Sequence, residues 1–565
     1  MNRNVISIIV IAGLLQVACT VVQPVDDEVP VDSDYVGTTE PFASEAVYFI
    51  VTDRFVDGDA NNNFPEQGGV ALGTFDRPIR LADSAPANIG YLGGDFKGVI
   101  DNAGYIAEMG FTSIWLTPIV DNPDEAFTGG KAPGEGGSND YGKTGYHGYW
   151  GVNFFELDEH LPSKGLDYAT LTQRLRSEHG IKTVLDVVCN HGSPSFSMPK
   201  DQPKYGEIYD GDGTLLADHG NLHPSELDPA DPFHTFYRTE PDLAELSDMD
   251  YDNPAVLEYF VAAHSRWIEE GAAAIRIDTI KHMPHSFWKA FSDRLRQRYP
   301  GLFMFAEAWS FEAEFLAEYT YPENGAISIL DFPGREAMVS VFGAHDGAYS
   351  NLIEYLHLDS GTYQNPYELM TFYDNHDMTR IDADQAGFID ANNWLFTSRG
   401  IPVVYYGSEI GFRAGADQHA GNRDYFGQEN VDSARSHPIR SALSRVATTR
   451  KSSVALQRGL QANLEFADDT AAFYRVYQKD GVNQTALVLL NKGDTAARFD
   501  VSTWLSRGPW RDAGNGEVFI VTDESPRIAA TVPSHDVRIL LFDEPVNNLA
   551  FAAELNQLRH AGGRK

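Results

Sequence analysis

Residues 273–282 read AAIRIDTIKH, and residues 182–191 read KTVLDVVCNH. In each stretch a short apolar run ends in charged and amide side chains, a pattern typical of a buried strand whose carboxyl end faces a functional site. Similar strand-like runs recur along the first four-fifths of the chain. The eight predicted strands are Val47–Phe55, Thr112–Ile119, Lys182–Cys189, Ala273–Ile280, Leu302–Trp309, Ile327–Phe332, Glu368–Asp374 and Ile401–Tyr406.

Amphipathic helical patterns lie between these runs. The clearest are Val99–Met109, Tyr168–His179, Pro254–Glu270, Phe287–Tyr299 and Ala391–Ser398. Strands that alternate with helices predict an α/β fold with a parallel sheet, and eight such units predict a closed (β/α)8 TIM barrel. We assign residues 45–189 and 251–457 to this barrel.

Two segments depart from the alternation. Residues 190–250, after the third strand, are polar and rich in Asp, Gly, Pro and His, which predicts an inserted domain, here called domain B. From residue 458 the runs become short and alternating, as in Ala472–Tyr477, Thr485–Leu490, Val518–Thr522 and Val537–Phe542. This pattern predicts a C-terminal antiparallel β-sandwich over 458–543, followed by a tail with a short helix over 544–565. The glycine-rich segment 128–145 is expected to form a mobile loop above the barrel.

The first residues have the features of an export signal. One Arg precedes an apolar run from Val5 to Leu15, which is too short to span a bilayer, and residues 15–19 (LQVAC) are similar to a lipoprotein cleavage box. We therefore predict a signal peptide over 1–19 with lipidation of Cys19; secretion after cleavage nearby is the alternative. Residues 20–44 are acidic and are predicted to form a flexible linker. The protein is thus expected outside the cytoplasm, anchored to the cell envelope, most simply the outer membrane, or secreted.

The net charge of the chain limits the classes of molecule that we expect it to bind. The 565 residues include 43 Lys+Arg and 81 Asp+Glu, for a formal net charge of −38. Nucleic acids are bound by basic surfaces, so a nucleic-acid partner is excluded, and membrane contact is expected only through a lipid on Cys19. Cys189 is the only other cysteine, so no intrachain disulfide is expected beside a lipidated Cys19. The oligomeric state stays open.

Three carboxylates follow predicted strands of the barrel: Asp278, Glu307 and Asp377. Barrel enzymes gather their active groups at the carboxyl ends of the strands, so these side chains should meet in one pocket. Glycoside cleavage with a nucleophile requires one ionised and one protonated carboxyl group. Arg276 shares a strand face with Asp278 and could keep it ionised, whereas Glu307 must hold its proton at neutral pH. A single carboxylate of this kind would be read as a structural ion pair; the set of three favours catalysis.

With these motifs in order, the chain from about Val47 to Phe542 resembles the α-amylase superfamily, glycoside hydrolase family 13. The resemblance implies a calcium-dependent, retaining attack on α-glucosidic bonds of a glucan. It implies that Asp278 is the nucleophile, Glu307 the general acid/base and Asp377 a stabiliser of the transition state. The residues that it implies in substrate binding are Tyr149, His191, Arg276, Lys281, His282, Trp309, His376 and Arg423.

Within the superfamily the chain looks most like the cyclodextrin glucanotransferases, because of IVTDRFVDGDANNN at 50–63 and the motif Lys281-His282-Met283-Pro284. Two departures favour hydrolysis of starch, maltooligosaccharides or cyclodextrins at α-1,4 bonds. The chain ends soon after the third domain, and Ala244 stands where the branch carries a large aromatic. A glucanotransferase with the same three carboxylates is the first alternative, and a non-catalytic glucan-binding lipoprotein the second.

The resemblance also implies calcium, which prefers hard oxygen ligands. One set comprises Asn190, Asp248 and the backbone oxygen of His282. The second set comprises Asp57, Asp59, Asn62, Asn63, Asp95 and the backbone of Gly93. The alternative for residues 57–63 is an ordinary turn rich in Asp and Asn.

Overall fold

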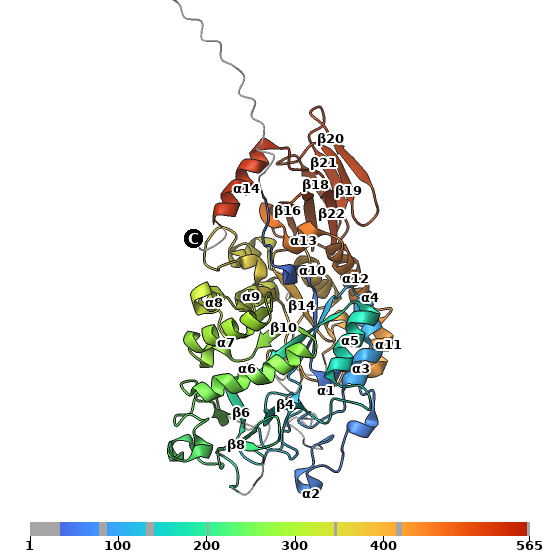
Figure 1. Ribbon diagram of the computed structural model, residues 1–565. Helices are drawn as coiled ribbons and strands as arrows, with labels where there is room; N and C mark the ends of the chain where they lie inside the picture. The colour runs from blue at the N-terminus through green and yellow to red at the C-terminus, as the bar shows by residue number, and fades with distance from the viewer. Residues whose placement is uncertain are drawn as a thin grey trace, which may run out of the picture.

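The computed structural model describes residues 34–77, 79, 87–131, 140–200, 202, 204–343, 347–413 and 421–561. The predicted signal peptide and Cys19 lie outside these residues, so lipidation stays a prediction. Across the described chain, helices long and apolar enough to cross a bilayer are absent. A central barrel has the C-terminal sheet domain at one end and strands β4, β6 and β8 of the insertion at the other (Figure 1).

Eight parallel strands form the barrel, which confirms the predicted fold. Their order in the sheet is β12-β11-β10-β5-β2-β1-β14-β13, and a parallel bridge between Leu330 and Met370 joins the two ends. The strands are β1 (Val47–Ile50), β2 (Ser113–Leu116), β5 (Lys182–Val187), β10 (Ala272–Ile277), β11 (Phe303–Ala306), β12 (Ser328–Ile329), β13 (Met370–Thr371) and β14 (Ile401–Tyr405).

Helices surround the sheet on its outer face. They include α5 (Tyr168–His179), α6 (Pro254–Glu269), α7 (His285–Arg298), α8 (Ala313–Thr320), α9 (Phe332–Phe342), α10 (Gln385–Leu395), α11 (Gly427–Ala434) and α12 (Pro438–Lys451). The single helix predicted over Val99–Met109 is instead two, α3 (Phe96–Asp101) and α4 (Ala103–Glu108). The break falls at Asn102, whose side-chain amide donates to the carbonyl of Gly98 and competes with the helical pattern.

The first predicted strand is shorter than expected. It ends at Ile50, and Thr52–Phe55 form a short helix, α1. Asp53 explains this turn, because its buried carboxylate accepts hydrogen bonds from the backbone N–H groups of Leu92 and Gly93 at 3.0 Å. The chain therefore turns out of the sheet after Ile50, and this brings the Asp53 carboxylate to the loop that contains Leu92 and Gly93.

The inserted domain includes more of the chain than residues 190–250. A four-stranded sheet joins β3 (Val120–Asp121) and β4 (Asn153–Leu157), from the connection after β2, to β7 (Glu207–Tyr209) and β8 (Leu215–Asp218). A separate pair, β6 (His191–Pro194) and β9 (Leu246–Asp248), is antiparallel and sets His191 opposite Asp248. Domain B is therefore built from two connections of the barrel, the one after β2 and the one after β5. It lies directly above the carboxyl end of β5.

The C-terminal domain contains a six-stranded antiparallel sheet and a two-stranded partner. The larger sheet has the order β15-β16-β17-β22-β19-β20, and β18 (Ala497–Val501) pairs with β21 (Ile528–Val532). The other strands are β15 (Leu460–Phe466), β16 (Thr470–Lys479), β17 (Val482–Asn491), β19 (Gly508–Asp512), β20 (Val518–Val521) and β22 (Asp536–Phe542). Helix α14 (Leu549–Ala561) packs on this domain, since Phe551 stacks on Trp504 with ring centroids 5.5 Å apart.

The expectation of a flexible linker over 20–44 is wrong for residues 34–44. Tyr35 is fully buried and pairs with Gln478 of β16. Phe42 stacks on Phe303 of β11 with ring centroids 4.6 Å apart. These aromatic anchors, set in an otherwise polar segment, fix it across the barrel and the C-terminal domain.

Candidate active site

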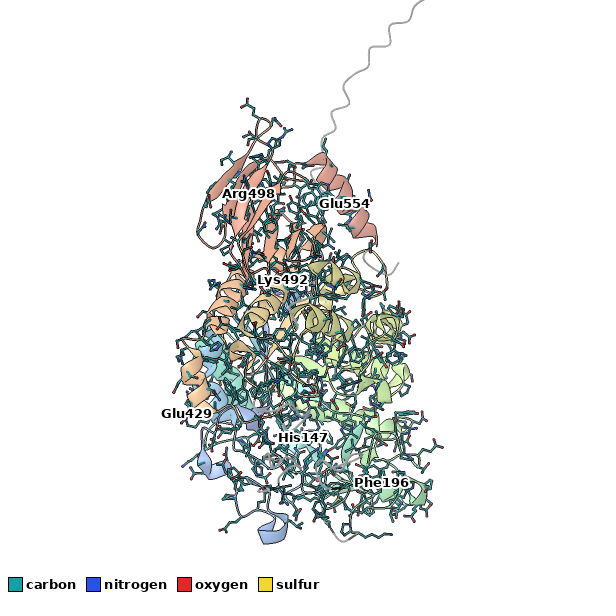
Figure 2. All side chains as sticks on the ribbon, turned by 180° about the vertical axis from the view of Figure 1, so that it is seen from behind. His147, Phe196, Glu429, Lys492, Arg498 and Glu554 are labelled. Atoms are coloured by element: carbon teal, nitrogen blue, oxygen red, sulfur yellow. The ribbon has the colours of Figure 1, made fainter. Side chains whose placement is uncertain are left out.

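A cavity of about 390 Å³ opens at the carboxyl ends of the barrel strands. All three carboxylates, Asp278, Glu307 and Asp377, line it. Its wall also includes His147, which Figure 2 shows at the end of the barrel away from Arg498 and Glu554 of the C-terminal domain. Of the predicted substrate contacts, the cavity brings together Tyr149, His191, Lys281, His282, Trp309, His376 and Arg423.

Arg276 lies beneath the cavity floor and is almost completely buried. Its Nη1 atom donates to Asp278 Oδ1 at 2.7 Å, and its Nη2 atom lies 3.8 Å from Glu307 Oε2. The alternation of side chains along β10 puts Arg276 and Asp278 on the same face, as the sequence spacing predicts. One guanidinium group thus compensates two carboxylates that stand side by side.

Asp186, in β5, is a residue that sequence reasoning missed. Its carboxylate accepts from Arg276 Nη1 at 2.9 Å, from the Tyr149 hydroxyl at 2.8 Å and from Trp115 Nε1 at 2.9 Å. The sequence could have pointed to Asp186, because an acidic residue inside the apolar run 182–189 requires buried partners. Asp186 fixes both Arg276 and the ring of Tyr149.

Glu307 has the environment of a proton donor. Burial, followed by the negative charge of Asp278, raises its pKa to about 7, against the opposing effect of Arg276. Its Oε2 atom accepts from the backbone N–H of Thr279 at 3.2 Å. Thr279 adopts the left-handed conformation at φ 49°, which is strained for a β-branched residue and directs this N–H at Glu307. Glu307 can therefore hold a proton near neutral pH.

In the cavity wall Asp377 lies between Arg423 and His376. Arg423 Nη2 donates to Asp377 Oδ1 at 2.7 Å, and His376 Nε2 lies 3.3 Å from Asp377 Oδ2. Burial, and then the charges of Arg423 and Arg276, lowers the pKa of His376 well below its usual range. Burial lowers the pKa of His191 to about 4. Both imidazoles are neutral at pH 7 and can bind uncharged hydroxyl groups.

Comparisons with known proteins identify the family to which this barrel belongs. Residues 49–453 match the family of alpha-amylase catalytic domains. The chain belongs to the alpha-amylase family, glycoside hydrolase family 13. It is 29% identical over 503 residues to a cyclomaltodextrin glucanotransferase of Klebsiella oxytoca, covering 80% of this chain and 71% of that protein. It is 29% identical over 475 residues to an alpha-amylase of Niallia circulans, covering 82% and 83%.

Among solved structures, a cyclomaltodextrin glucanotransferase described as the first with a three-domain ABC distribution is similar, with a TM-score of 0.71 and 28% identity over 89% of this chain and 99% of that one. The chain spans 60% of the glucanotransferase of Thermoanaerobacterium thermosulfurigenes. Both hydrolases and transferases thus occur among the relatives. A three-domain layout is compatible with either activity, so domain number does not favour hydrolysis.

The second set of expected calcium ligands lies beside α1 in this family 13 barrel. Asn63 Nδ2 donates to Asp57 Oδ2 at 2.9 Å, and Asn62 Nδ2 donates to Asp95 Oδ2 at 3.2 Å. The Oδ1 atoms of Asn62 and Asn63 are buried and, among the described residues, have no hydrogen-bond partner. Two orphaned amide oxygens beside two carboxylates form the oxygen-rich donor set that calcium prefers.

Gly93 and Asp59 take different positions around that set. A Cβ atom at Gly93 would lie 2.7 Å from Asn63 Oδ1 and 2.8 Å from Asp57 Oδ2, so glycine lets the backbone approach these oxygens. The carboxylate of Asp59 instead accepts from the backbone N–H of Asn61 at 3.1 Å, as the N-cap of a short 3-10 helix. Its Oδ1 atom caps this helix, so we expect Asp59 to be dispensable for calcium binding.

The first set lies where domain B meets the barrel. The backbone oxygen of Asn190 accepts from the N–H of Met249, next to Asp248, at 2.8 Å. Asp248 accepts from the N–H of Asp242 at 2.7 Å, and the His282 ring lies 3.2 Å from Asp242 Oδ2. Asp248 and His282 therefore both contact Asp242 at this junction, and Asn190 is joined to it through Met249.

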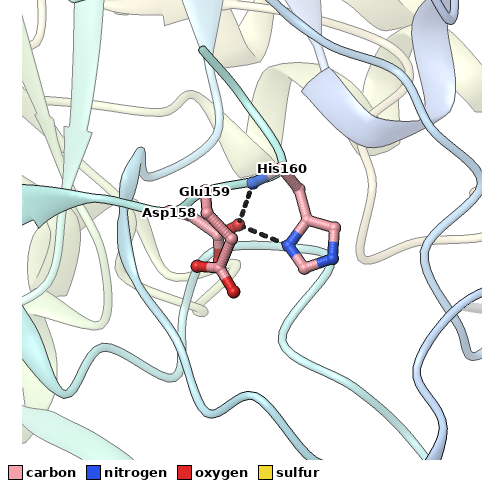
Figure 3. Close-up of side chains that lie close together, drawn as sticks. All are labelled: Asp158, Glu159 and His160. Atoms are coloured by element: carbon pink, nitrogen blue, oxygen red, sulfur yellow. Dashed lines mark hydrogen bonds and ion pairs between the residues drawn. The ribbon is translucent and has the colours of Figure 1, made fainter. Parts of the chain in front are cut away.

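Another acidic cluster, Asp158, Glu159 and His160, lies in the connection after β4 (Figure 3). Asp158 Oδ1 accepts from the ring and the backbone N–H of His160 at 2.9 and 3.0 Å. Asp158 Oδ2 accepts from the hydroxyl of Tyr91 at 2.8 Å, and Tyr91 stacks on His160. Asp158 is thus satisfied within the fold and has a structural role, whereas Nε2 of His160 is buried without a hydrogen-bond partner among the described residues.

Proposed function

We propose that this family 13 enzyme is a retaining hydrolase that cleaves α-1,4-glucosidic bonds in starch and maltooligosaccharides. The observation that carries the proposal is the pair above Arg276: Asp278 bonded to the guanidinium at 2.7 Å and Glu307 with its pKa raised to about 7. One carboxyl group is hydrogen-bonded to a cation, and its neighbour can hold a proton near neutral pH. This asymmetry is what double-displacement cleavage needs.

The reaction proceeds in two displacements. Asp278 attacks the anomeric carbon while Glu307 donates its proton to the departing glycosidic oxygen, and the bond between that oxygen and the anomeric carbon breaks. Glu307, now ionised, then removes a proton from water, whose oxygen displaces Asp278 from the anomeric carbon. The product keeps the α configuration, and both carboxyl groups return to their starting states.

The other cavity residues hold the sugar. The ring of Tyr149 lies nearly parallel to that of His376, at 20° with centroids 5.4 Å apart, and offers an apolar surface to a pyranose. Asp377, oriented by Arg423, can accept from ring hydroxyls. These contacts would strengthen as the ring flattens in the transition state.

The proton on Glu307 predicts a pH dependence. The protonated, active form predominates below the raised pKa, so kcat/KM is expected to fall as pH rises through about 7. A pH profile of maltooligosaccharide cleavage checks this. A rate that stays level to pH 9 would contradict the assignment of Glu307 as the acid.

Hydrolysis is favoured over transfer by Ala244. This residue is exposed on the cavity wall, where its methyl group offers no ring on which an acceptor sugar could stack. Ala244→Tyr is expected to raise the ratio of transfer to hydrolysis about fivefold, the factor that corresponds to about 1 kcal/mol of stacking.

Chromatography of the products formed from soluble starch measures this ratio. Ala244→Leu is the matched control, because it adds apolar volume without a flat ring, and it should stay near the parent. Mainly cyclic products from the parent enzyme would favour the glucanotransferase alternative. Absence of turnover in the parent would favour the glucan-binding lipoprotein.

We also propose that the enzyme binds calcium, which would supply charge to hold loop oxygens together at the two ligand sets. A cation bound only by the folded state stabilises it, so excess chelator is expected to lower Tm by about 2–5 °C. The orphaned oxygens of Asn62 and Asn63 predict a smaller chelator effect in Asn62→Ala/Asn63→Ala. Asp59→Ala should keep the parent's sensitivity, since that carboxylate caps Asn61. An unchanged parent Tm in chelator would refute structural calcium.

A further inference from the structure

Domain B carries a second groove, of about 470 Å³, outside the active cavity. Leu227 and Tyr237, both buried, form its floor. One wall includes His234 of a short 3-10 helix (Pro232–His234), and the other leads into the start of α6. Arg238, Glu240, Tyr251 and Asp252 also line it.

The groove and the active cavity meet at one carboxylate. Arg238, on the groove wall, lies 3.5 Å from Asp242 Oδ2, and the same oxygen lies 3.2 Å from the ring of His282. His282 lines the active cavity. The side chains of Arg238, Asp242 and His282 therefore link a wall of the groove to a wall of the active cavity.

The groove has the mixed surface that a sugar requires. Arg238 lies over the ring of Tyr251 at 4.9 Å, so its guanidinium group covers one face of this half-buried ring and offers hydrogen-bond donors to the groove. Phe233 does not line the groove, but it directly precedes the lining residue His234 and is 44% exposed, which is unusual for so large an apolar side chain. Glu240 and Asp252 are exposed acceptors on the same groove. Apolar rings suit the faces of a pyranose, and carboxylates suit its hydroxyl groups.

We propose that this groove is an auxiliary site for an α-glucan, which holds a distant stretch of the same chain whose bond is cut in the active cavity. The inference rests on the proposed function for the class of ligand. It adds that long glucans gain affinity from domain B, because a second contact on a tethered chain acts at high effective concentration. Short oligosaccharides confined to the active cavity do not share this gain.

The direct test is retention in a native gel that contains soluble starch. Glu307→Gln provides a background in which the starch is not digested during the run. Adding Glu240→Ala/Asp252→Ala, or Phe233→Ala, should weaken retention about three- to tenfold in apparent Kd, the range expected for one or two lost hydrogen bonds or a lost stacking contact. Asp523→Ala/Glu524→Ala is the matched control, because it removes the same charge from the exposed surface of the C-terminal domain.

Kinetics give a second, independent readout on the active enzyme. The groove variants should raise KM for soluble starch by a similar factor while kcat stays the same, and maltotriose should be cleaved with the parent's kcat/KM. Groove variants that match the control variant in both retention and starch KM would overturn the inference. So would unchanged retention together with weaker binding of added Ca²⁺ by isothermal titration, because the groove would then be a cation site.

The two proposals can fail separately. A parent enzyme that cleaves starch while the groove variants behave like the control removes the auxiliary site alone. A parent that cleaves no glucan removes the proposed hydrolysis, whereas weaker starch retention of the groove variants would still support the site.

Discussion

Asp278→Asn is expected to lower kcat for maltooligosaccharide cleavage on the order of 10⁴-fold, because an amide cannot form the covalent ester with the anomeric carbon. The substitution keeps the size of the side chain. The oxygen of the introduced amide can still accept from Arg276, so the fold should be retained. Single-turnover rates at a saturating concentration of maltoheptaose measure the loss without interference from binding.

Glu245→Gln is the matched control for this change. Glu245 also lines the active cavity, and its carboxylate accepts a hydrogen bond from Ser197 in domain B. Turnover close to the parent is expected for this variant. Turnover of Asp278→Asn within tenfold of the parent would mean that another group attacks the sugar.

Arg276→Met is expected to have the largest effect on stability. The guanidinium is buried and bonds to both Asp186 and Asp278, so its removal leaves two buried carboxylates without their cation. Breaking a buried ion pair from one side costs about 3–5 kcal/mol, and the free energy of unfolding should fall by about that much. Activity should fall as well, because Asp278 would lose the hydrogen bond from Arg276 that orients it.

Urea unfolding followed by tryptophan fluorescence measures the stability change. Arg174→Met is the control, since its partner Glu178 lies one turn along the same helix and both side chains are exposed; a much smaller loss than that of Arg276→Met is expected. Arg276→Lys keeps the charge but not the forked geometry, so it should recover part of the stability and little of the activity. Equal losses in Arg276→Met and Arg174→Met would contradict the central role of this cation.

The sequence predicts the barrel because each strand carries its own local signal. Apolar runs such as 182–187 and 272–277 are buried on both faces, and the polar residues that follow them fall at one edge of the sheet. The convergence of Asp278, Glu307 and Asp377 on one cavity follows from that topology. Placing the carboxylates therefore needs no knowledge of loop conformation.

Features that depend on distant partners could not be predicted in this way. The two-residue strand Val120–Asp121 has no periodicity of its own and exists because it pairs with Asn153–Leu157. Residues 34–44 have the composition of a linker, and only the folded structure shows that Tyr35 and Phe42 are buried. The orphaned oxygens of Asn62 and Asn63, and the junction at Asp242, likewise arise only when separate loops meet.

The most direct test of the account is to trap the glycosyl-enzyme intermediate. A slowly hydrolysed fluorinated α-glucosyl fluoride should add one sugar to the protein, and peptide mass spectrometry should place that sugar on Asp278. The adduct should be absent in Asp278→Asn and should turn over when a maltooligosaccharide acceptor is added. A sugar attached to any other residue, or a first product of β configuration by NMR in place of an adduct, would contradict double displacement at Asp278.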